Sequence, residues 1–359
     1  MCNDYIPFVW RADQNTYWAH WKRQIMDPVS QGILGASFSQ SAVQNKKLLG
    51  LVGFIGFMAG MAPDLDIFIQ SHEDPLLFLE FHRQFTHALV FIPFGGLICA
   101  SLFFLFSKIR QSISFKKVWI SSTIGYGTHG LLDGCTSYGT LLFWPFSYER
   151  ISWNNISIID PLFTVPLIIF VFLSIYLTKV SFARFAVIWA LFYLAVGLVL
   201  NDKALDIGKD LADDRGHQVD RIVAKPTFAN VFLWKVIYES NGKFYTDGVR
   251  LLPRKKIFPG TSVNKLNISR DFAWLDNASQ QAHDIKRFNW FSQDYLAASP
   301  EHPNQIIDIR YSLLPNQISG LWGIELNKSA EASEHVKYIS TRNISKGRFK
   351  DLLLMIFGD

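Results

Sequence analysis

Long apolar stretches alternate with short polar connections over the first 200 residues of the chain. A helix needs about 20 predominantly apolar residues to cross a bilayer. Five stretches reach or nearly reach that length: residues 48–69, 88–107, 118–144, 158–178 and 183–200. A weaker segment, residues 29–43, is rich in small residues and is typical of an interfacial or re-entrant helix. The pattern predicts an α-helical, multi-pass membrane bundle of about five spans.

The pattern after residue 200 is that of a water-soluble domain. Residues 201–221 are polar and helical in pattern, and strand signals follow. The segment VFLWKVIYESNGKFYTDGVRLL has β-rich runs on both sides of Asn241-Gly242, a strong hairpin signal. IIDIRYSLL and SGLWGIEL predict further strands, whereas residues 333–358 are ambiguous. We therefore expect a membrane domain over residues 26–200 and a small, mainly antiparallel β domain over residues 201–359.

Residues 1–25 fit neither pattern. They contain no apolar h-region, so they do not resemble a secretory signal peptide. Met26 begins a segment, MDPVSQGILGA, that reads like a natural start. We expect residues 1–25 to be a disordered extension or the product of an incorrectly assigned start codon.

Charge divides the chain in the same way. Residues 1–200 hold 13 Lys/Arg and 11 Asp/Glu, and the remainder holds 22 and 19. The net charge of +5 includes no long basic block, so we expect no nucleic-acid partner. The cysteines are Cys2, Cys99 and Cys135, without a CxxC spacing, so zinc held by thiolates is not expected.

Basic residues close to the apolar stretches predict their orientation, because Lys and Arg concentrate in cytoplasmic connections. Eight basic residues lie before the first stretch or in the second and fourth connections: Lys46, Lys47, Lys108, Arg110, Lys116, Lys117, Lys179 and Arg184. The first and third connections hold only Arg83 and Arg150. The β domain would then lie outside, in the periplasm if the protein is in a bacterial inner membrane.

Three groups of polar residues interrupt the apolar pattern on the predicted outer side. In MAPDLD, Asp64 and Asp66 would point the same way in an extended turn, as paired metal ligands do, although Asp64 could simply cap a short helix. In HRQFTH, His82 and His87 reach one site only if the helix breaks near Arg83 or if they serve adjacent metals. Their other interpretation is contact with lipid headgroups.

The third group lies in GYGTHGLLDGCTSYGT, where His129 and Asp133 are four residues apart and share a helix face. They could hold a cation or form a neutral polar pair between helices. Asp160 could cap the helix that follows it, and Arg150 could anchor to headgroups beside an aromatic belt. Because buried carboxylates and imidazoles are costly, we expect the three groups to share a divalent cation: zinc, manganese or iron.

The motifs MDPVSQGILGA, MAPDLD, HRQFTH, THGLLDGCTSYGTLLFWPFS and IIDPLFT resemble the YdjM-like family of membrane-bound, metal-dependent hydrolases over roughly residues 26–200. That family looks distantly similar to zinc-dependent phospholipase C and P1-type nucleases. The resemblance implies an inner-membrane helical protein with a centre of one or two metal ions. It implies these ligands: Asp64, Asp66, His82, His87, His129 and Asp133. One departure is Gln31, where many relatives have a histidine.

We therefore expect a membrane-embedded hydrolase that cleaves a phosphoester of a lipid or lipid-linked substrate at the outer leaflet. Arg83 would neutralise the phosphate oxygens, and Asp133 or Asp66 would accept a proton. The alternative is a membrane scaffold or binding module whose β domain binds a protein partner. A metal transporter is a third hypothesis, but the polar groups gather at one side instead of lining a path across.

Overall fold

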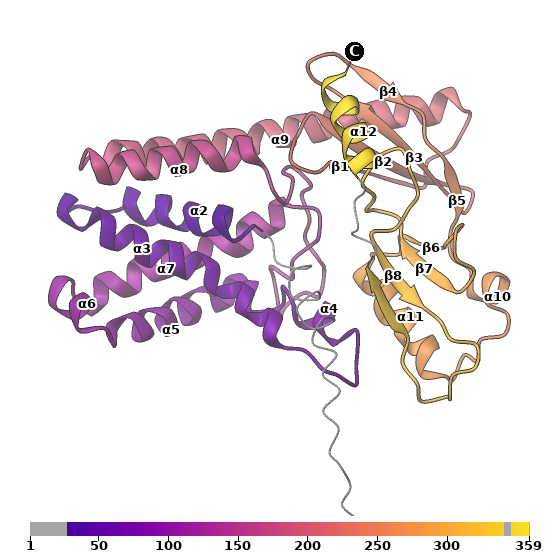
Figure 1. Ribbon diagram of the computed structural model, residues 1–359, viewed down its shortest axis with the longest axis horizontal. Helices are drawn as coiled ribbons and strands as arrows, with labels where there is room; N and C mark the ends of the chain where they lie inside the picture. The colour runs from indigo at the N-terminus through magenta and orange to yellow at the C-terminus, as the bar shows by residue number, and fades with distance from the viewer. Residues whose placement is uncertain (1–26, 341–345, 359) are drawn as a thin grey trace, which may run out of the picture.

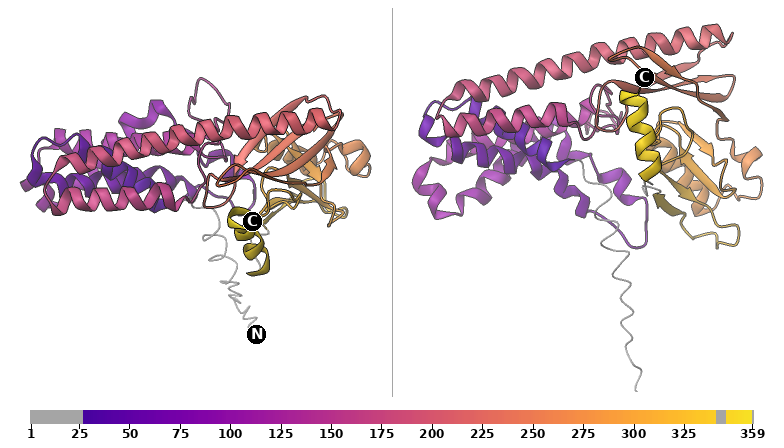
Figure 2. Two further views of the ribbon diagram at one scale, coloured as in Figure 1. Left: turned by 90° about the horizontal axis from the view of Figure 1, so that it is seen from above. Right: turned by 45° about the horizontal axis from the view of Figure 1, so that its top comes forward.

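The computed structural model describes residues 27–340 and 346–358 and shows a helical bundle joined to a β domain (Figure 1). The expectation for residues 1–25 lies outside these ranges. The elements of the bundle are α2 (Pro28–Ser41), η1 (Lys46–Leu48), α3 (Leu49–Met61), η2 (Ala62–Phe68), α4 (Leu77–Phe81), η3 (Phe85–His87), η4 (Leu89–Phe91), α5 (Ile92–Phe104), α6 (Ser107–Ser112), α7 (Phe115–Cys135), α8 (Pro161–Tyr176) and α9 (Val180–Asp214). The helix α9 runs from the bundle into the β domain (Figure 2).

Two helical segments among the described residues are long and apolar enough to cross a membrane, Lys46–Phe68 and Val180–Asp214. A third span results if Leu77–His87 and Leu89–Phe104, which meet at a bend of 54°, act together. The expected five spans are not supported. The helix α8 has only 16 residues, and α7 is rich in Gly, Ser and Thr that it buries against its neighbours. Neither helix therefore combines the length and the apolar composition of a membrane span.

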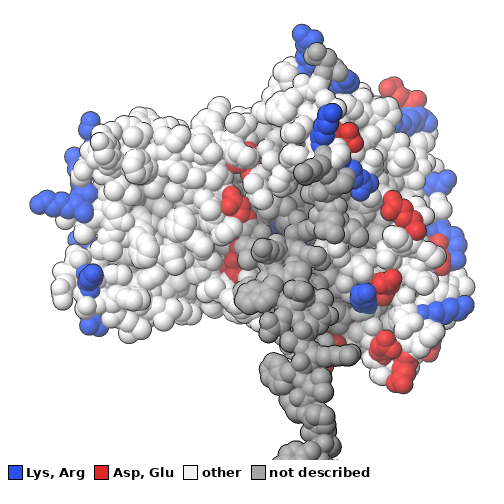
Figure 3. Space-filling view, viewed as in Figure 1, with Lys and Arg blue, Asp and Glu red and all other residues white. Residues whose placement is uncertain are grey.

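The charges on the surface follow the axis of the bundle. Figure 3 shows Lys and Arg gathered at the end of the bundle opposite the β domain, with a largely uncharged surface up to the junction. Large apolar side chains are exposed on that surface, among them Phe94, Leu102, Phe172 and Phe192. Such an extensive apolar surface is not typical of a soluble protein and suits contact with lipid. This distribution agrees with the separation of basic residues seen in the sequence.

Glycines allow α2, α3 and α7 to pack with their backbones in contact. A Cβ atom on Gly35 would lie 2.4 Å from the carbonyl oxygen of Gly56, and a Cβ atom on Gly125 would lie 2.4 Å from the same oxygen. These neighbours are backbone atoms, so they cannot rotate out of the way. Small residues allow this close approach of helices. The contact brings Gly60, at the end of α3, within reach of His129 on α7.

The β domain contains two antiparallel sheets. The first sheet has the order β1-β2-β3-β4, with β5 paired to β3, and the second has the order β6-β7-β8-β9. The strands are β1 (Arg221–Pro226), β2 (Leu233–Ser240), β3 (Lys243–Arg250), β4 (Lys256–Phe258), β5 (Ser262–Asn264), β6 (Leu296–Ala298), β7 (Gln305–Asp308), β8 (Trp322–Glu325) and β9 (Lys337–Ser340). Its shorter helices are α10 (Ile268–Asp271), α11 (Gln280–Phe291) and α12 (Lys346–Phe357).

The antiparallel β domain expected from the sequence is confirmed. Asn241 and Gly242 both have positive φ, at 52° and 67°, and join β2 to β3 as the hairpin signal indicated. Of the two further predicted strands, IIDIRYSLL overlaps β7 only over residues 306–308, and SGLWGIEL contains β8. The polar helix expected over residues 201–221 is instead the last part of α9, which ends at Asp214. The ambiguous segment 333–358 contains β9 and α12.

Buried lysines are an unusual feature of this domain. Lys235 on β2 donates to Ser312 Oγ at 2.7 Å and to the carbonyl of Gln317 at 2.8 Å. Burial lowers its pKa to about 7 from an ordinary 10.5. The folded protein therefore releases a proton from this side chain near neutral pH, while the unfolded chain keeps it until about pH 10.4.

We expect Gly125→Ala to destabilise the bundle by about 1–3 kcal/mol, because the added methyl group meets backbone atoms of α3. The matched control is Gly50→Ala, where the nearest atom lies 3.8 Å from the added carbon. Thermal unfolding of the purified protein in detergent measures both variants. Equal transition temperatures for the two would contradict the role assigned to this contact.

Stability should rise with pH between about 7 and 10, because the unfolded state binds more protons than the folded state over that window. The contribution of Lys235 approaches about 1.4 kcal/mol per pH unit. Replacing it in Lys235→Met should flatten the pH dependence of the unfolding temperature. The exposed Lys243→Met is the control and should leave the slope as in the wild type. A slope unchanged by Lys235→Met would exclude this lysine as the titrating group.

Candidate metal centre

The first pair of carboxylates lies on η2, directly after α3. Pro63 stands in the first turn of this 3-10 helix, where its missing N–H is tolerated. The extended turn expected for MAPDLD is therefore wrong. Asp64 and Asp66 are nevertheless both buried, and both contact His87, Asp64 at its Nε2 atom and Asp66 at its Nδ1 atom.

The two histidines of HRQFTH do not lie on one continuous helix. The helix is interrupted near Arg83, which was one of the two conditions for both histidines to reach the same site. The helix α4 ends at Phe81, and Arg83 has φ of 67°, a left-handed conformation that is uncommon for a residue with a side chain. This turn redirects the backbone before η3. His82 and His87, which one continuous helix would place on different faces, consequently have ring centroids only 5.9 Å apart.

Four ligand atoms meet between η2, η3 and α7. His87 Nε2 lies 3.4 Å from Asp64 Oδ1 and 3.3 Å from Asp133 Oδ2. His129 Nε2 lies 3.3 Å and 3.8 Å from the same two oxygens. A tetrahedral site with bonds of about 2.0–2.1 Å separates its ligand atoms by about 3.3 Å. These four separations, 3.3–3.8 Å, are therefore close to this value, and all four ligand atoms lie within 4.8 Å of one another, so the group could hold a metal ion.

None of these four atoms has a hydrogen-bond partner among the residues that the structure describes. An unsatisfied buried polar group is costly, and four together are rare. The other nitrogen of each histidine is engaged. His129 Nδ1 lies 2.6 Å from the carbonyl of Gly60, which can only accept, so Nδ1 donates and Nε2 carries the lone pair. The arrangement fits a cation that all four atoms face.

Asp66 supports this group from outside. Its Oδ2 accepts from the backbone N–H of Arg83 at 3.0 Å and from Thr86 Oγ1 at 2.7 Å. The same oxygen lies 3.2 Å from His87 Nδ1, and Oδ1 lies 2.7 Å from His82 Nδ1. A carboxylate that holds the outer nitrogen of a ligating histidine fixes the orientation of its ring.

A second group of ligand atoms overlaps the first. It consists of Asp64, Asp66 and His82, whose ligand atoms lie within 4.8 Å of one another. His82 is the more accessible histidine, with 15% of its side chain exposed, while the rings of His87 and His129 are buried. The structure thus brings the six expected ligands into two adjoining groups that share Asp64.

Arg83 stands beside the centre with its guanidinium buried. Its Nε lies 3.0 Å from Asp133 Oδ2, and the group sits over the ring of Tyr138 at 5.1 Å. Its Nη1 makes no hydrogen bond within the described part of the chain. Gln31 donates from Nε2 to Asp133 Oδ1 at 2.6 Å. It therefore orients a carboxylate.

The headgroup contact expected for Arg150 is wrong. This arginine does not anchor to headgroups, because it is buried and donates to the carbonyl of Gly139 at 2.9 Å. It also lies against the rings of Trp290 and Phe291 from α11. Burial, followed by the guanidinium groups of Arg83 and Arg310, lowers the pKa of Arg150 to about 9. No local signal marks this contact, because α11 lies 140 residues further along the chain.

Asp160 caps α8 as expected. Its Oδ1 accepts from the backbone N–H of Leu162 at 3.1 Å, and its Oδ2 accepts from the hydroxyl of Tyr193 at 2.9 Å. A cap of this kind satisfies backbone donors that the first helical turn leaves free. Asp160 therefore has a structural role apart from the metal centre.

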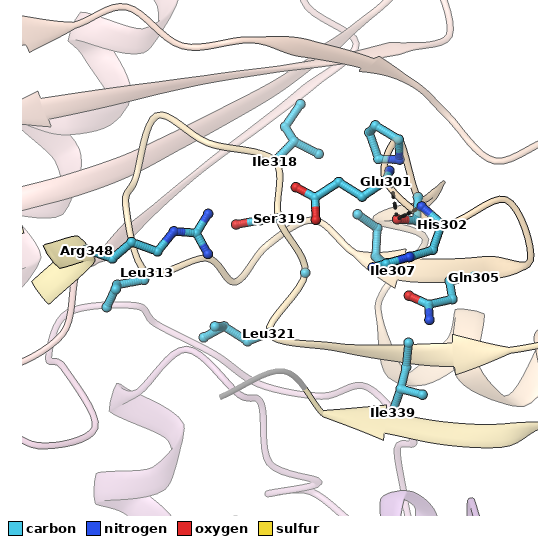
Figure 4. Close-up of a pocket in the computed structure, with 13 residues that line it drawn as sticks. Glu301, His302, Gln305, Ile307, Leu313, Ile318, Ser319, Leu321, Ile339 and Arg348 are labelled. Carbon is cyan, nitrogen blue, oxygen red and sulfur yellow. Dashed lines mark hydrogen bonds between the residues drawn. The ribbon is translucent and has the colours of Figure 1, made fainter. Parts of the chain in front are cut away.

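A separate pocket of about 90 Å³ lies in the β domain (Figure 4). Glu301, His302, Gln305 and Arg348 are among its polar residues. It contains none of the residues expected to bind metal. The chemistry predicted from the sequence therefore concerns the buried centre in the bundle and not this pocket.

Comparison with known proteins agrees with the resemblance in part. The family model for YdjM inner membrane protein matches residues 26–204. The uncharacterized protein YfhP of Bacillus subtilis (strain 168) is 23% identical over 204 residues, which are 53% of this chain and 57% of that protein. The chain therefore spans little more than half the length of this curated relative. No solved structure matches the chain. Residues 26–204 thus match the YdjM inner membrane protein family, and this match together with the apolar helices supports a place in a membrane.

Proposed function

We propose that this protein is a metal-dependent hydrolase that cleaves a phosphoester of a lipid or lipid-linked substrate. The observation that carries the proposal is the set of four buried ligand atoms without hydrogen-bond partners, next to a buried guanidinium with a free Nη1. Two carboxylates and two imidazoles without thiolate suit zinc, with manganese or iron as alternatives. The adjoining group that contains His82 could hold a second ion.

A divalent cation bound here would supply Lewis-acid activation of water and of a phosphoryl oxygen. Arg83 would donate from Nη1 to another phosphoryl oxygen and offset the charge that develops there. Of the two candidate proton acceptors, Asp66 already receives several donors. Asp133 Oδ2 makes no hydrogen bond within the described residues, but it is one of the four ligand atoms and lies 3.0 Å from Arg83 Nε. Asp133 and Asp66 therefore both stay candidates for proton acceptance.

The position of the centre favours a lipid substrate at the outer leaflet. The ligands on η2 and His82 lie beside α4, which packs into the β domain, whereas Lys and Arg gather at the opposite end of the bundle (Figure 3). The positive-inside rule makes that basic end cytoplasmic. The β domain would then be periplasmic in a multi-pass protein of the bacterial inner membrane. Leu65 and Phe68, on the same 3-10 helix as the aspartates, are 62% and 55% exposed and suit contact with lipid.

The purified full-length protein should bind at least one equivalent of zinc or manganese, measured by elemental analysis. The double variant His129→Ala, Asp133→Ala should lose this metal, while the exposed pair His302→Ala, Asp206→Ala should retain it. The wild type in chelator should be about 3 kcal/mol less stable to unfolding than the wild type with free metal at 100 times its dissociation constant. Binding of less than a tenth of an equivalent would favour the scaffold or binding module.

Arg83→Gln should lower turnover of a phospholipid or a generic phosphodiester by about 10²–10³-fold, because it removes the charge next to the reacting phosphate. Metal content should stay near the wild-type value, since the four ligand atoms are intact. Arg270→Gln, at an exposed ion pair with Asp271, is the matched control. Full activity in Arg83→Gln, or no turnover by metal-loaded wild type, would contradict the proposal.

A further inference from the structure

His82, Arg83 and His87 lie on the chain segment between η2 and α5. This segment leaves the bundle before it reaches these three residues. Between η2 and α5, the short helix α4 packs into the core of the β domain. Leu76 and Leu79 are 1% and 6% exposed and belong to the same apolar cluster as Phe272, Ile285 and Phe288. His82 and Arg83 follow directly, so the chain passes from this core into the metal centre within a few residues.

Arg287 on α11 binds the same segment at two points. Its Nη1 and Nη2 donate to Asp74 Oδ1 at 2.9 Å and Oδ2 at 2.7 Å, and its Nε donates to Glu80 Oε1 at 2.5 Å. A bidentate pair of this kind fixes orientation as well as distance. Nη1 also donates to Asp284 at 3.0 Å, a carboxylate buried in the β domain. Asp74 precedes α4 and Glu80 lies in it, so Arg287 holds both ends.

The opposite charges of Arg287 and Asp74 stabilise the contact between them. Burial alone would raise the pKa of Asp74, but its hydrogen bonds with Arg287 lower the pKa below its usual value. The Arg287 side chain is 13% exposed, so solvent screens this attraction only in part. Arg150 adds a further restraint, because Nη1 donates to the carbonyl of Leu79 at 3.4 Å while α11 packs against its guanidinium.

We propose that Arg287 is a positioning residue for the metal centre. By fixing α4 in the β domain, it sets the direction in which residues 82–87 leave that helix and keeps Arg83 in its left-handed conformation. His82, Arg83 and His87 then face Asp64 and Asp66. The inference rests on the proposed function for its catalytic meaning, and it makes the β domain part of the site instead of a separate module for binding partners.

The test compares Arg287→Met with Arg270→Met in the full-length protein. Arg287→Met should weaken cobalt(II) binding by about 10–100-fold and change the visible spectrum of the bound ion, as loss of groups behind metal ligands does. Arg287→Lys keeps the charge but not the bidentate contact, and should recover part of the affinity. In hydrogen-exchange mass spectrometry, the amides of residues 82–91 should exchange at least about tenfold faster in Arg287→Met.

Asp74→Asn provides the test if Arg287→Met does not fold, because the contacts of Arg287 with Glu80 and Asp284 remain. It should shift the cobalt spectrum and exchange in the same direction. Wild-type exchange and cobalt affinity in both variants would overturn the inference. Hydrogen exchange needs neither metal nor turnover, so it decides the role of Arg287 even if the wild type proves not to be a hydrolase.

Discussion

Two carboxylates and two imidazoles are buried against one another between segments distant in the chain, and the membrane end of the molecule is organised around them. Transfer of charged or polar groups from water is costly unless they are paired. Here the inner atoms of Asp64, His87, His129 and Asp133 face one another without hydrogen bonds. The outer atoms of His129, His87 and Asp133 contact Gly60, Asp66 and Gln31, whereas Asp64 Oδ2 makes no hydrogen bond within the described residues. The surrounding residues thus orient three of these groups, and Arg83 Nε, 3.0 Å from Asp133 Oδ2, offsets part of the buried negative charge.

The close contact of the helices serves this arrangement. Gly35, Gly56 and Gly125 let three helices approach until their backbones touch. The same approach places the carbonyl of Gly60 against His129 and brings Gln31 to Asp133. A bundle with larger residues at these crossings would keep the histidine and its acceptor apart. The small residues in the weak apolar segments therefore have a geometric purpose, although they lower the hydropathy on which recognition of spans depends.

Local sequence patterns predicted the parts that depend on neighbouring residues. The spacing of His129 and Asp133 placed them on one helix face, and Asn241-Gly242 marked its hairpin. The number of spans could not be read in this way, because α7 buries small and polar residues against other helices and α8 has only 16 residues. The contacts of Arg150 with Leu79 and of Arg287 with Asp74 and Glu80 could not be read either, because these partners lie 71 to 213 residues away. A helix break near Arg83 was expected only as one of two conditions for the histidines to act together, and its left-handed conformation was not predicted.

The helix α9 has a mechanical consequence. It continues for 35 residues without proline, about 52 Å, from the bundle to the first sheet. At the exit from the bundle, Asn201 donates to the carbonyls of Asn154 and Ala224, which ties the helix to both parts. Such a rod resists bending, so the β domain cannot swing away like a lid on a hinge. Access to the buried carboxylates and imidazoles would instead need a local rearrangement of the short segments η2, α4 and η3.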